Sequence, residues 1–158
     1  MIKNYRVASA EETEKIGMML AEAFEKSGYA RGFIAMRGEM GVGKTAFTRG
    51  FCAHFGITGV KSPTYTVLNE YRGRHRVHHF DFYRITDGDD LYSIGYDDIV
   101  GSEGFSLGEW SENIEDFLPE DAITVTISRI PITEAGDEDR RIISIDTSNV
   151  QINLKDKL

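Results

Sequence analysis

The residues with the clearest chemical potential lie in residues 38–45, which read Gly-Glu-Met-Gly-Val-Gly-Lys-Thr. A glycine followed, after four residues, by Gly-Lys-Thr is the spacing of a P-loop, whose backbone N–H groups surround nucleotide phosphates. Its glycines allow positive φ angles, so that successive N–H groups point into one concavity. We expect Lys44 to be an exposed loop residue that contacts the β- and γ-phosphates, and Thr45 to ligate a magnesium ion. The predicted nucleotide-binding residues are Gly38, Glu39, Met40, Gly41, Val42, Gly43, Lys44, Thr45 and Ala46.

The segments on either side of this loop fit a P-loop unit. Residues 33–36 form a continuous apolar run, which is typical of a strand buried on both faces. Phe47, Phe51 and Phe55 recur every four residues and therefore share one face of a helix. Gly56 stands where a helix C-terminal cap is expected. The order strand, glycine-rich loop, helix supports nucleotide binding.

Two acidic residues at predicted strand ends are candidates for the catalytic chemistry. Asp81 closes the run 77–81, the position of a Walker B aspartate. Glu109 precedes the single tryptophan, Trp110, at the end of a second apolar run, 105–110. Because ligands of open α/β sheets bind beyond the carboxyl ends of parallel strands, we expect both side chains to converge on the P-loop. Either of them could orient or deprotonate the attacking water, so Lys44, Asp81 and Glu109 are the predicted catalytic residues.

The segment 61–66, Lys-Ser-Pro-Thr-Tyr-Thr, has two interpretations. Proline keeps the preceding Ser62 extended, and several hydroxyl groups cluster there. The segment is either a mobile switch-like loop or a turn that leads into a strand. The residues of the predicted switch-like loop are Ser62, Pro63, Thr64, Tyr65 and Thr66.

A predicted hairpin joins residues 67–71 to residues 77–82 and is rich in basic side chains. These side chains either mark a solvated sheet edge that repels other strands, or form a local contact for RNA or a protein partner. A zinc site is not expected, because the chain has one cysteine and the histidine spacing fits no tetrahedral motif. The basic residues are Arg72, Arg74, His75, Arg76, His78 and His79.

Other elements complete the predicted fold. Ser9 and Glu12 form a capping box at the start of an amphipathic helix, and the acidic residues 87–90 suit the N-terminus of a second helix. Residues 123–127 and 143–145 alternate as a closing antiparallel pair. We predict an α/β fold: a single P-loop NTPase domain over residues 1–158, with a mixed, mostly parallel sheet, helices on both faces and antiparallel edge hairpins.

The amino-acid composition limits the kinds of binding partner and the cellular compartment that we expect. The net charge is −8 with a pI near 5.0, which disfavours a broad nucleic-acid-binding face. Cys52 is the single cysteine, so no internal disulfide can form and a reducing compartment fits best; we read it as a small buried hydrophobe. No apolar run approaches the length of a membrane span, and no signal-peptide pattern follows Met1. We therefore expect a cytoplasmic protein without a membrane partner.

Four segments together carry a resemblance to a known family. Residues 38–45, 61–66, 79–84 (His-Phe-Asp-Phe-Tyr-Arg) and 109–110 (Glu-Trp) occur in this order at suitable intervals. The chain resembles the TsaE family, bacterial ATPases of the tRNA threonylcarbamoyladenosine pathway, from about residue 9 to residue 146. It departs from the family pattern in a polar insertion around 134–139.

The resemblance implies the following activity. The protein would bind ATP and Mg²⁺ and hydrolyse ATP to ADP and phosphate, without itself transferring the threonylcarbamoyl group. Its partners would be TsaD and TsaB, which modify adenosine beside the anticodon, and its ATPase would reset their complex. Contact with tRNA would be indirect or local.

The resemblance also implies roles for individual residues. Thr45 and Glu109 would hold magnesium, and Asp81 would also be needed for hydrolysis. Residues 62–66 would form the family's switch-like loop. Three further residues are predicted near the site: Tyr83, Arg84 and Trp110.

Other functions compete with this interpretation. A small-molecule kinase would need an arginine-bearing lid, which the sequence does not show, and a GTPase would need an Asn-Lys-x-Asp motif, which is absent. A third alternative is a nucleotide-gated binding module whose turnover is incidental. Because no arginine is clearly placed as a finger, we expect slow hydrolysis by the isolated protein.

Overall fold

The computed structural model describes residues 1–62, 67–133 and 136–158. Its strands are β1 (Ile2–Val7), β2 (Arg31–Arg37), β3 (Leu68–Arg72), β4 (Arg76–Asp81), β5 (Gly104–Glu109), β6 (Ile123–Arg129) and β7 (Arg141–Asp146). Its helices are α1 (Ala10–Lys26), α2 (Lys44–His54), α3 (Gly88–Ser93) and α4 (Tyr96–Gly101), with the 3₁₀ helices η1 (Ser111–Phe117) and η2 (Asp137–Asp139).

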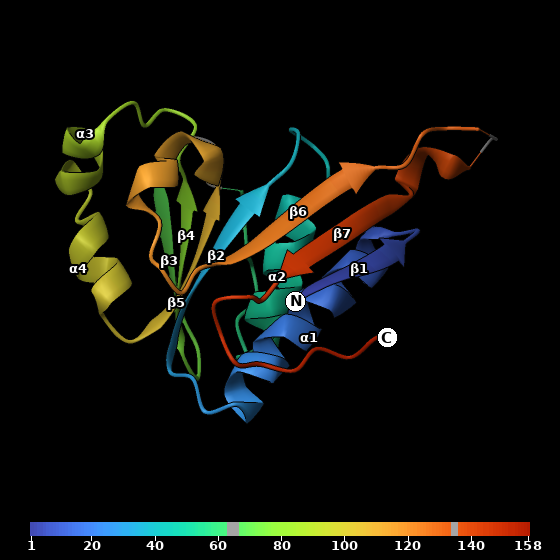
Figure 1. Ribbon diagram of the computed structural model, residues 1–158, viewed down its shortest axis with the longest axis horizontal. Helices are drawn as coiled ribbons and strands as arrows, with labels where there is room; N and C mark the ends of the chain where they lie inside the picture. The colour runs from blue at the N-terminus through green and yellow to red at the C-terminus, as the bar shows by residue number, and fades with distance from the viewer. Residues whose placement is uncertain (63–66, 134–135) are drawn as a thin grey trace.

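The strands form one mixed sheet in the order β1-β7-β6-β2-β5-β4-β3 (Figure 1). The central strands β6, β2, β5 and β4 run parallel, and β3, β7 and β1 join them antiparallel. The β3–β4 hairpin closes one edge, and the β6–β7 pair, flanked by β1, lies toward the other. The predicted α/β class and the parallel centre are confirmed.

Helices cover both faces of the sheet, as predicted. In Figure 1, α1 and α2 lie against one face, and α3 and α4 lie on the other. On β2, Ile34 and Met36 belong to the core under α1 and α2, whereas Phe33 and Ala35 belong to the core under α3 and α4. This alternation explains the continuous apolar run, since both faces of β2 are covered. No helix among the described residues is both long and apolar enough to cross a bilayer.

Close packing of α1 on α2 fixes the helix that follows the P-loop. A Cβ atom added to Gly17 would lie 2.1 Å from the Phe47 carbonyl oxygen, and one added to Gly50 would lie 1.8 Å from the Glu14 carbonyl oxygen. Only glycine at these two positions lets the helix backbones approach so closely. The packing therefore holds the N-terminus of α2 in place at the end of the glycine-rich loop.

The capping box at the start of α1 forms with one change. The Ser9 hydroxyl accepts a hydrogen bond from the Glu12 N–H at 3.2 Å, as predicted. The Glu12 carboxylate accepts from the Ala8 N–H at 2.8 Å rather than from the N–H of Ser9. Asp87 likewise caps α3, accepting from the Asp90 N–H at 3.0 Å, as expected for this acidic segment.

Cys52 is fully buried on α2. Burial raises the pKa of its thiol to about 12, because the thiolate would lose its hydration. The thiol is therefore a weak nucleophile at neutral pH, which agrees with its interpretation as a small buried hydrophobe.

Candidate functional site

The loop between β2 and α2 has the backbone that its glycines predict. Gly38, Gly41 and Gly43 have φ angles of 146°, 74° and 121°. Gly43 is the N-cap of α2, and no hydrogen bond from a described side chain caps this end of the helix. The first N–H groups of α2 and the positive end of its dipole therefore suit an anion.

A cavity of about 380 Å³ lies beside this loop. It joins the loop to the ends of β4 and β5, which are parallel neighbours in the sheet. A larger hollow, of about 1040 Å³ between β1, α1 and the C-terminal residues, contains none of the predicted site residues. The smaller cavity is lined by Met40, Gly41, Gly43, Lys44, Thr45, Ser62, Asp81, Glu109 and Trp110.

Lys44 lies across the loop rather than out in solvent. Only 5% of its surface is exposed, so the expectation of an exposed loop lysine is wrong. Its Nζ donates to the Gly38 carbonyl oxygen at 2.7 Å and lies 4.7 Å from the centroid of the Trp110 ring. The loop and the indole hold the ammonium at the cavity wall, where it can meet a phosphate.

Asp81 and Glu109 stand side by side at the ends of β4 and β5, where they are register partners. Because side chains alternate along a strand, Asp81 shares the α2 face of the sheet with Val77, and Glu109 shares it with Leu107. Both carboxylates line the cavity with Lys44. The structure therefore brings the three predicted catalytic residues to one cavity.

The Asp81 carboxylate is half-buried and accepts a hydrogen bond from the Tyr83 N–H at 2.9 Å. Burial raises the pKa of Asp81, and the negative charge of Glu109 raises it further. The Tyr83 N–H and the positive charge of Lys44 act in the opposite direction. This carboxylate is therefore more basic than an exposed aspartate, which suits a group that must accept a proton.

His79 is the main site residue that the sequence interpretation missed. Both interpretations of the hairpin placed His78 and His79 at a charged surface, but only 6% and 0% of their surfaces are exposed. The reason is that β4 lies between β3 and β5, so it is an inner strand. His79 Nε2 lies 2.6 Å from Glu109 Oε2. The two-residue spacing from Asp81 on the same strand was the available signal.

Several other basic residues of the hairpin lie close to acidic side chains. Glu25, in the last turn of α1, lies 3.0 Å from His54 Nε2, 3.5 Å from Arg74 Nη2 and 4.0 Å from His75 Nε2. Arg72 Nε lies 3.6 Å from a Glu70 carboxylate oxygen. We call Glu25, His54, Arg74 and His75 the Glu25 cluster. Glu25 therefore offsets the charge of Arg74, and Glu70 lies close enough to offset that of Arg72.

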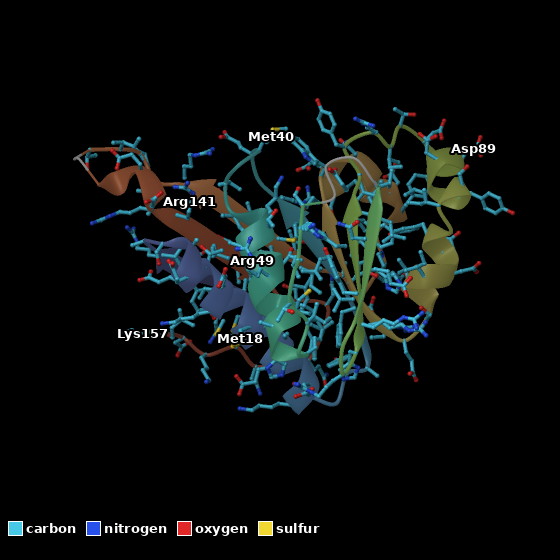
Figure 2. All side chains as sticks on the ribbon, turned by 180° about the vertical axis from the view of Figure 1, so that it is seen from behind. Met18, Met40, Arg49, Asp89, Arg141 and Lys157 are labelled. Carbon is cyan, nitrogen blue, oxygen red and sulfur yellow. The ribbon has the colours of Figure 1, made fainter. Side chains whose placement is uncertain are left out.

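Two arginines that no motif predicted hold the loop from outside. Arg129, at the end of β6, donates to Glu39 Oε2 at 2.9 Å and to the Met40 carbonyl oxygen at 3.4 Å. Arg141, at the start of β7, donates through Nε to the Val42 carbonyl oxygen at 3.0 Å. Figure 2 shows Met40 at the outer end of the loop and Arg141 on β7. When the N–H groups of such a loop face an anion, its carbonyl groups need donors on the other side.

The residues predicted near the site fall into two groups. The rings of Tyr83 and Trp110 lie 5.1 Å apart, and Trp110 lines the cavity. Trp110 has φ 59°, a conformation that costs energy in a non-glycine residue and often marks a functional site. Arg84 is exposed and does not line the cavity. Of the predicted switch-like loop, Ser62 lines the cavity, and residues 63–66 lie outside the described residues.

The side chains present fit a magnesium ion at the coarse level of their chemistry. Thr45, Asp81 and Glu109 offer hydroxyl and carboxylate oxygens, which are hard ligands, around one cavity. Within the described ranges, no three His, Cys, Asp or Glu side chains are grouped closely enough to enclose a metal by themselves. Magnesium usually keeps several waters and shares phosphate oxygens with one or two protein ligands.

Comparisons with known proteins agree with the geometry. The model of the family described as threonylcarbamoyl adenosine biosynthesis protein TsaE matches residues 7–142. A tRNA threonylcarbamoyladenosine biosynthesis protein TsaE from Bacillus subtilis (strain 168) is 37% identical over 140 residues, covering 87% of this chain and 82% of that protein. Its namesake from Rickettsia felis is 30% identical over 151 residues, covering 94% and 82%.

A solved structure extends the comparison to the fold. The crystal structure of Bacillus subtilis YdiB matches with a TM-score of 0.72 and 30% identity, covering 94% of this chain and 88% of that chain. The resemblance carried by the four motifs is thereby confirmed. The chain belongs to the TsaE family.

Proposed function

We propose that this protein is a magnesium-dependent ATPase that serves tRNA threonylcarbamoyladenosine biosynthesis in the cytoplasm. The observation that carries the proposal is the meeting of Lys44, Asp81 and Glu109 at one cavity beside a P-loop. Membership of the TsaE family supports the pathway, because the curated relatives are named for it. ATP is the nucleotide that the family resemblance implies.

In the proposed mechanism, the protein mainly positions the phosphates of ATP and neutralises the negative charge that develops on them. The N–H groups of residues 38–46 hold the phosphates, and Lys44 offsets the negative charge that develops at the γ-phosphoryl group. Thr45 and Glu109 are the residues that would hold magnesium, which supplies further charge neutralisation when bound. Asp81, with its raised pKa, is then the carboxylate that orients the water and can accept its proton.

Water attacks the γ-phosphorus while the bond to the β–γ bridging oxygen breaks. ADP and inorganic phosphate leave, and the proton of the water passes to solvent through Asp81. None of the residues that the structure assigns to the cavity wall is an arginine. We therefore expect slow turnover by the isolated protein and faster turnover when a partner completes the site.

TsaD and TsaB are the partners that the family resemblance implies, and we propose them for this chain. No lysine, arginine or histidine occurs between Arg84 and Arg129, a span that includes α3, α4 and η1 and carries many aspartates and glutamates. Phosphate contacts need basic side chains, so this face would repel an RNA backbone. Any tRNA contact is therefore proposed to be local and elsewhere on the molecule.

The test is multi-turnover tRNA modification with purified TsaD and TsaB, with and without this protein. We expect modification to continue beyond one cycle only with this protein and hydrolysable ATP, and we expect the partners to raise its phosphate release. Equal modification with a non-hydrolysable analogue would favour the nucleotide-gated binding module. Phosphate transfer to a small-molecule acceptor would favour a kinase.

A further inference from the structure

We infer that His79 is a positioning residue that orients Glu109 toward the nucleotide and its metal. The inference rests on the proposed ATPase function and adds a residue to its machinery. His79 does not line the cavity; it lies one pleat below Asp81 on the same face of β4. It would therefore act on the reaction mainly through Glu109, its hydrogen-bonded partner.

The contact between the two side chains is short and buried. His79 Nε2 lies 2.6 Å from Glu109 Oε2, and the two side chains are 0% and 9% exposed. A carboxylate can only accept, so Nε2 must carry the proton of this hydrogen bond. The bond engages Oε2 of Glu109, and we infer that the other oxygen, Oε1, serves the cavity that Glu109 lines.

The other ring nitrogen argues against a role in packing alone. Among the buried side-chain atoms that the structure describes, His79 Nδ1 lacks a hydrogen-bond partner. A buried polar atom without a partner destabilises the fold, and an apolar ring would fill the same space without that cost. What the imidazole provides, and an apolar ring could not, is the hydrogen bond to Glu109. Such outer contacts to a metal-binding carboxylate fix its orientation.

The experiment compares two amide variants of the full-length protein. The Gln amide nitrogen reaches about as far as His Nε2, whereas the Asn amide nitrogen reaches only as far as Nδ1. His79→Gln should therefore keep the bond to Glu109, and His79→Asn should lose it. Both variants bury one amide, and thermal unfolding of each shows how far the bond lost in His79→Asn lowers stability.

The first readout is the magnesium dependence of ADP binding, followed by the fluorescence of Trp110, the single tryptophan, at the cavity. We expect His79→Asn to weaken the magnesium-dependent part of ADP binding about tenfold, and to leave ADP binding without magnesium unchanged. His79→Gln should stay within about threefold of wild type in both titrations. A residue that only supports the fold would shift the thermal midpoint and leave the magnesium dependence alone.

The second readout is the turnover of ATP in a double-mutant cycle. His79→Asn should lower kcat about tenfold in the wild-type background and have almost no further effect in Glu109→Gln, because its route of action is already lost. Full additivity of the two losses, or unchanged magnesium dependence in folded His79→Asn, would overturn the inference. If His79→Asn does not fold, His79→Phe replaces it with the same expected losses.

Failure of the proposed function gives a different result. Wild-type protein would then neither bind nucleotide with a magnesium dependence nor release phosphate, with or without partners. If both folded variants keep wild-type activity and wild-type magnesium dependence, the inference about His79 is rejected and the proposed ATPase function stands.

Discussion

Among the described residues, two histidines are hydrogen-bonded to a glutamate, and the two pairs differ in burial. His79 lies 2.6 Å from Glu109, and both side chains are buried near the P-loop. His54 lies 3.0 Å from Glu25, whose side chain is 38% exposed and is shared with Arg74 and His75. Within the described ranges, the first carboxylate contacts His79 from inside the fold, whereas the second is shared by three side chains and is partly exposed to solvent. The same pair of residue types can therefore position a reactive group in one place and join surface elements in another.

Their places in the fold explain the difference. Glu109 ends the parallel strand β5, where a sheet of this kind binds ligands. Glu25 lies in the last turn of α1, where the helix dipole disfavours a negative charge. Contacts of Glu25 with His54 on α2 and with Arg74 and His75 of the β3–β4 hairpin connect the three elements, and the charge of Arg74 offsets that of Glu25. The Glu25 cluster thus contributes modestly to stability, while the buried pair is expected to affect turnover.

Among substitutions near the buried pair, the largest effect on ATP turnover is expected from Lys44→Ala. It removes the ammonium that faces the phosphates and should lower kcat/KM for ATP at least about 100-fold. The fold should persist, because the variant loses one hydrogen bond, to Gly38, and the contact with Trp110, together about 1–2 kcal/mol. Steady-state phosphate release and thermal unfolding check both expectations. Wild-type kinetics in Lys44→Ala would show that the P-loop does not bind the reacting nucleotide.

A smaller loss is expected from Glu109→Gln, which keeps the shape of the side chain and removes its charge. We expect kcat to fall about 100-fold, equivalent to roughly 2.7 kcal/mol of transition-state stabilisation, while nucleotide binding is largely spared. Raising the magnesium concentration should recover part of the rate if Glu109 is a ligand. Little recovery would identify it as a base, and near-wild-type hydrolysis would leave Asp81 as the acidic candidate.

Sequence reasoning found the parts of this site whose chemistry depends on a local motif. The loop glycines, Lys44 and Thr45 follow from one spacing, and Asp81 and Glu109 follow from the rule that parallel strands end at the ligand. His79 was missed because its role depends on a neighbouring strand: the sequence shows a basic hairpin but does not show that β4 is an inner strand. The same kind of reasoning identified the sheet class, because apolar runs and turns are local patterns.

The two arginines outside the loop were missed for a similar reason. Arg129 and Arg141 are brought to residues 39–42 by the pairing of β6 with β2 and β7, and no local pattern marks them. The burial of Lys44 was also unexpected, because it depends on the Trp110 ring from another strand end. Contacts between elements, rather than the elements themselves, were what the sequence did not show.

A moderate effect is expected from Arg129→Ala, which frees Glu39 and the Met40 carbonyl group. Arg129 is about half-exposed and Glu39 is largely exposed, so the loss of this ion pair should weaken ATP binding by no more than about fivefold. Glu39→Gln is the matched control, because it removes the ion pair and keeps the contact of Arg129 with the Met40 carbonyl group. Fluorescence titration at Trp110 measures both. An effect as large as that of Lys44→Ala would assign Arg129 to the phosphates themselves.

The smallest effect is expected from Glu25→Gln and concerns stability alone. The hydrogen bond with His54 lowers the pKa of Glu25, and the charge of Arg74 lowers it further. A carboxylate with a lowered folded-state pKa adds stability above its unfolded pKa, and this stability is lost as the pH falls through the folded-state value. Wild type should therefore unfold at a slightly higher temperature than Glu25→Gln at neutral pH, and the difference should vanish in acid.

Thermal unfolding across this pH range checks the prediction, with ATP turnover as the control. Glu25 lies in the last turn of α1 and does not line the cavity, so Glu25→Gln should hydrolyse ATP at the wild-type rate. A difference in midpoint that persists or grows in acid would show that the Glu25 cluster stabilises the fold by something other than its charge.

The most direct test of the whole account applies the same substitution to the two histidines. Phosphate release from ATP with magnesium is measured for wild type, His79→Asn and His54→Asn under identical conditions. We expect measurable release by wild type, a kcat about tenfold lower in His79→Asn, and an unchanged kcat in His54→Asn. Equal rates in the two folded variants, or no release by any of the three proteins even with TsaD and TsaB present, would contradict it.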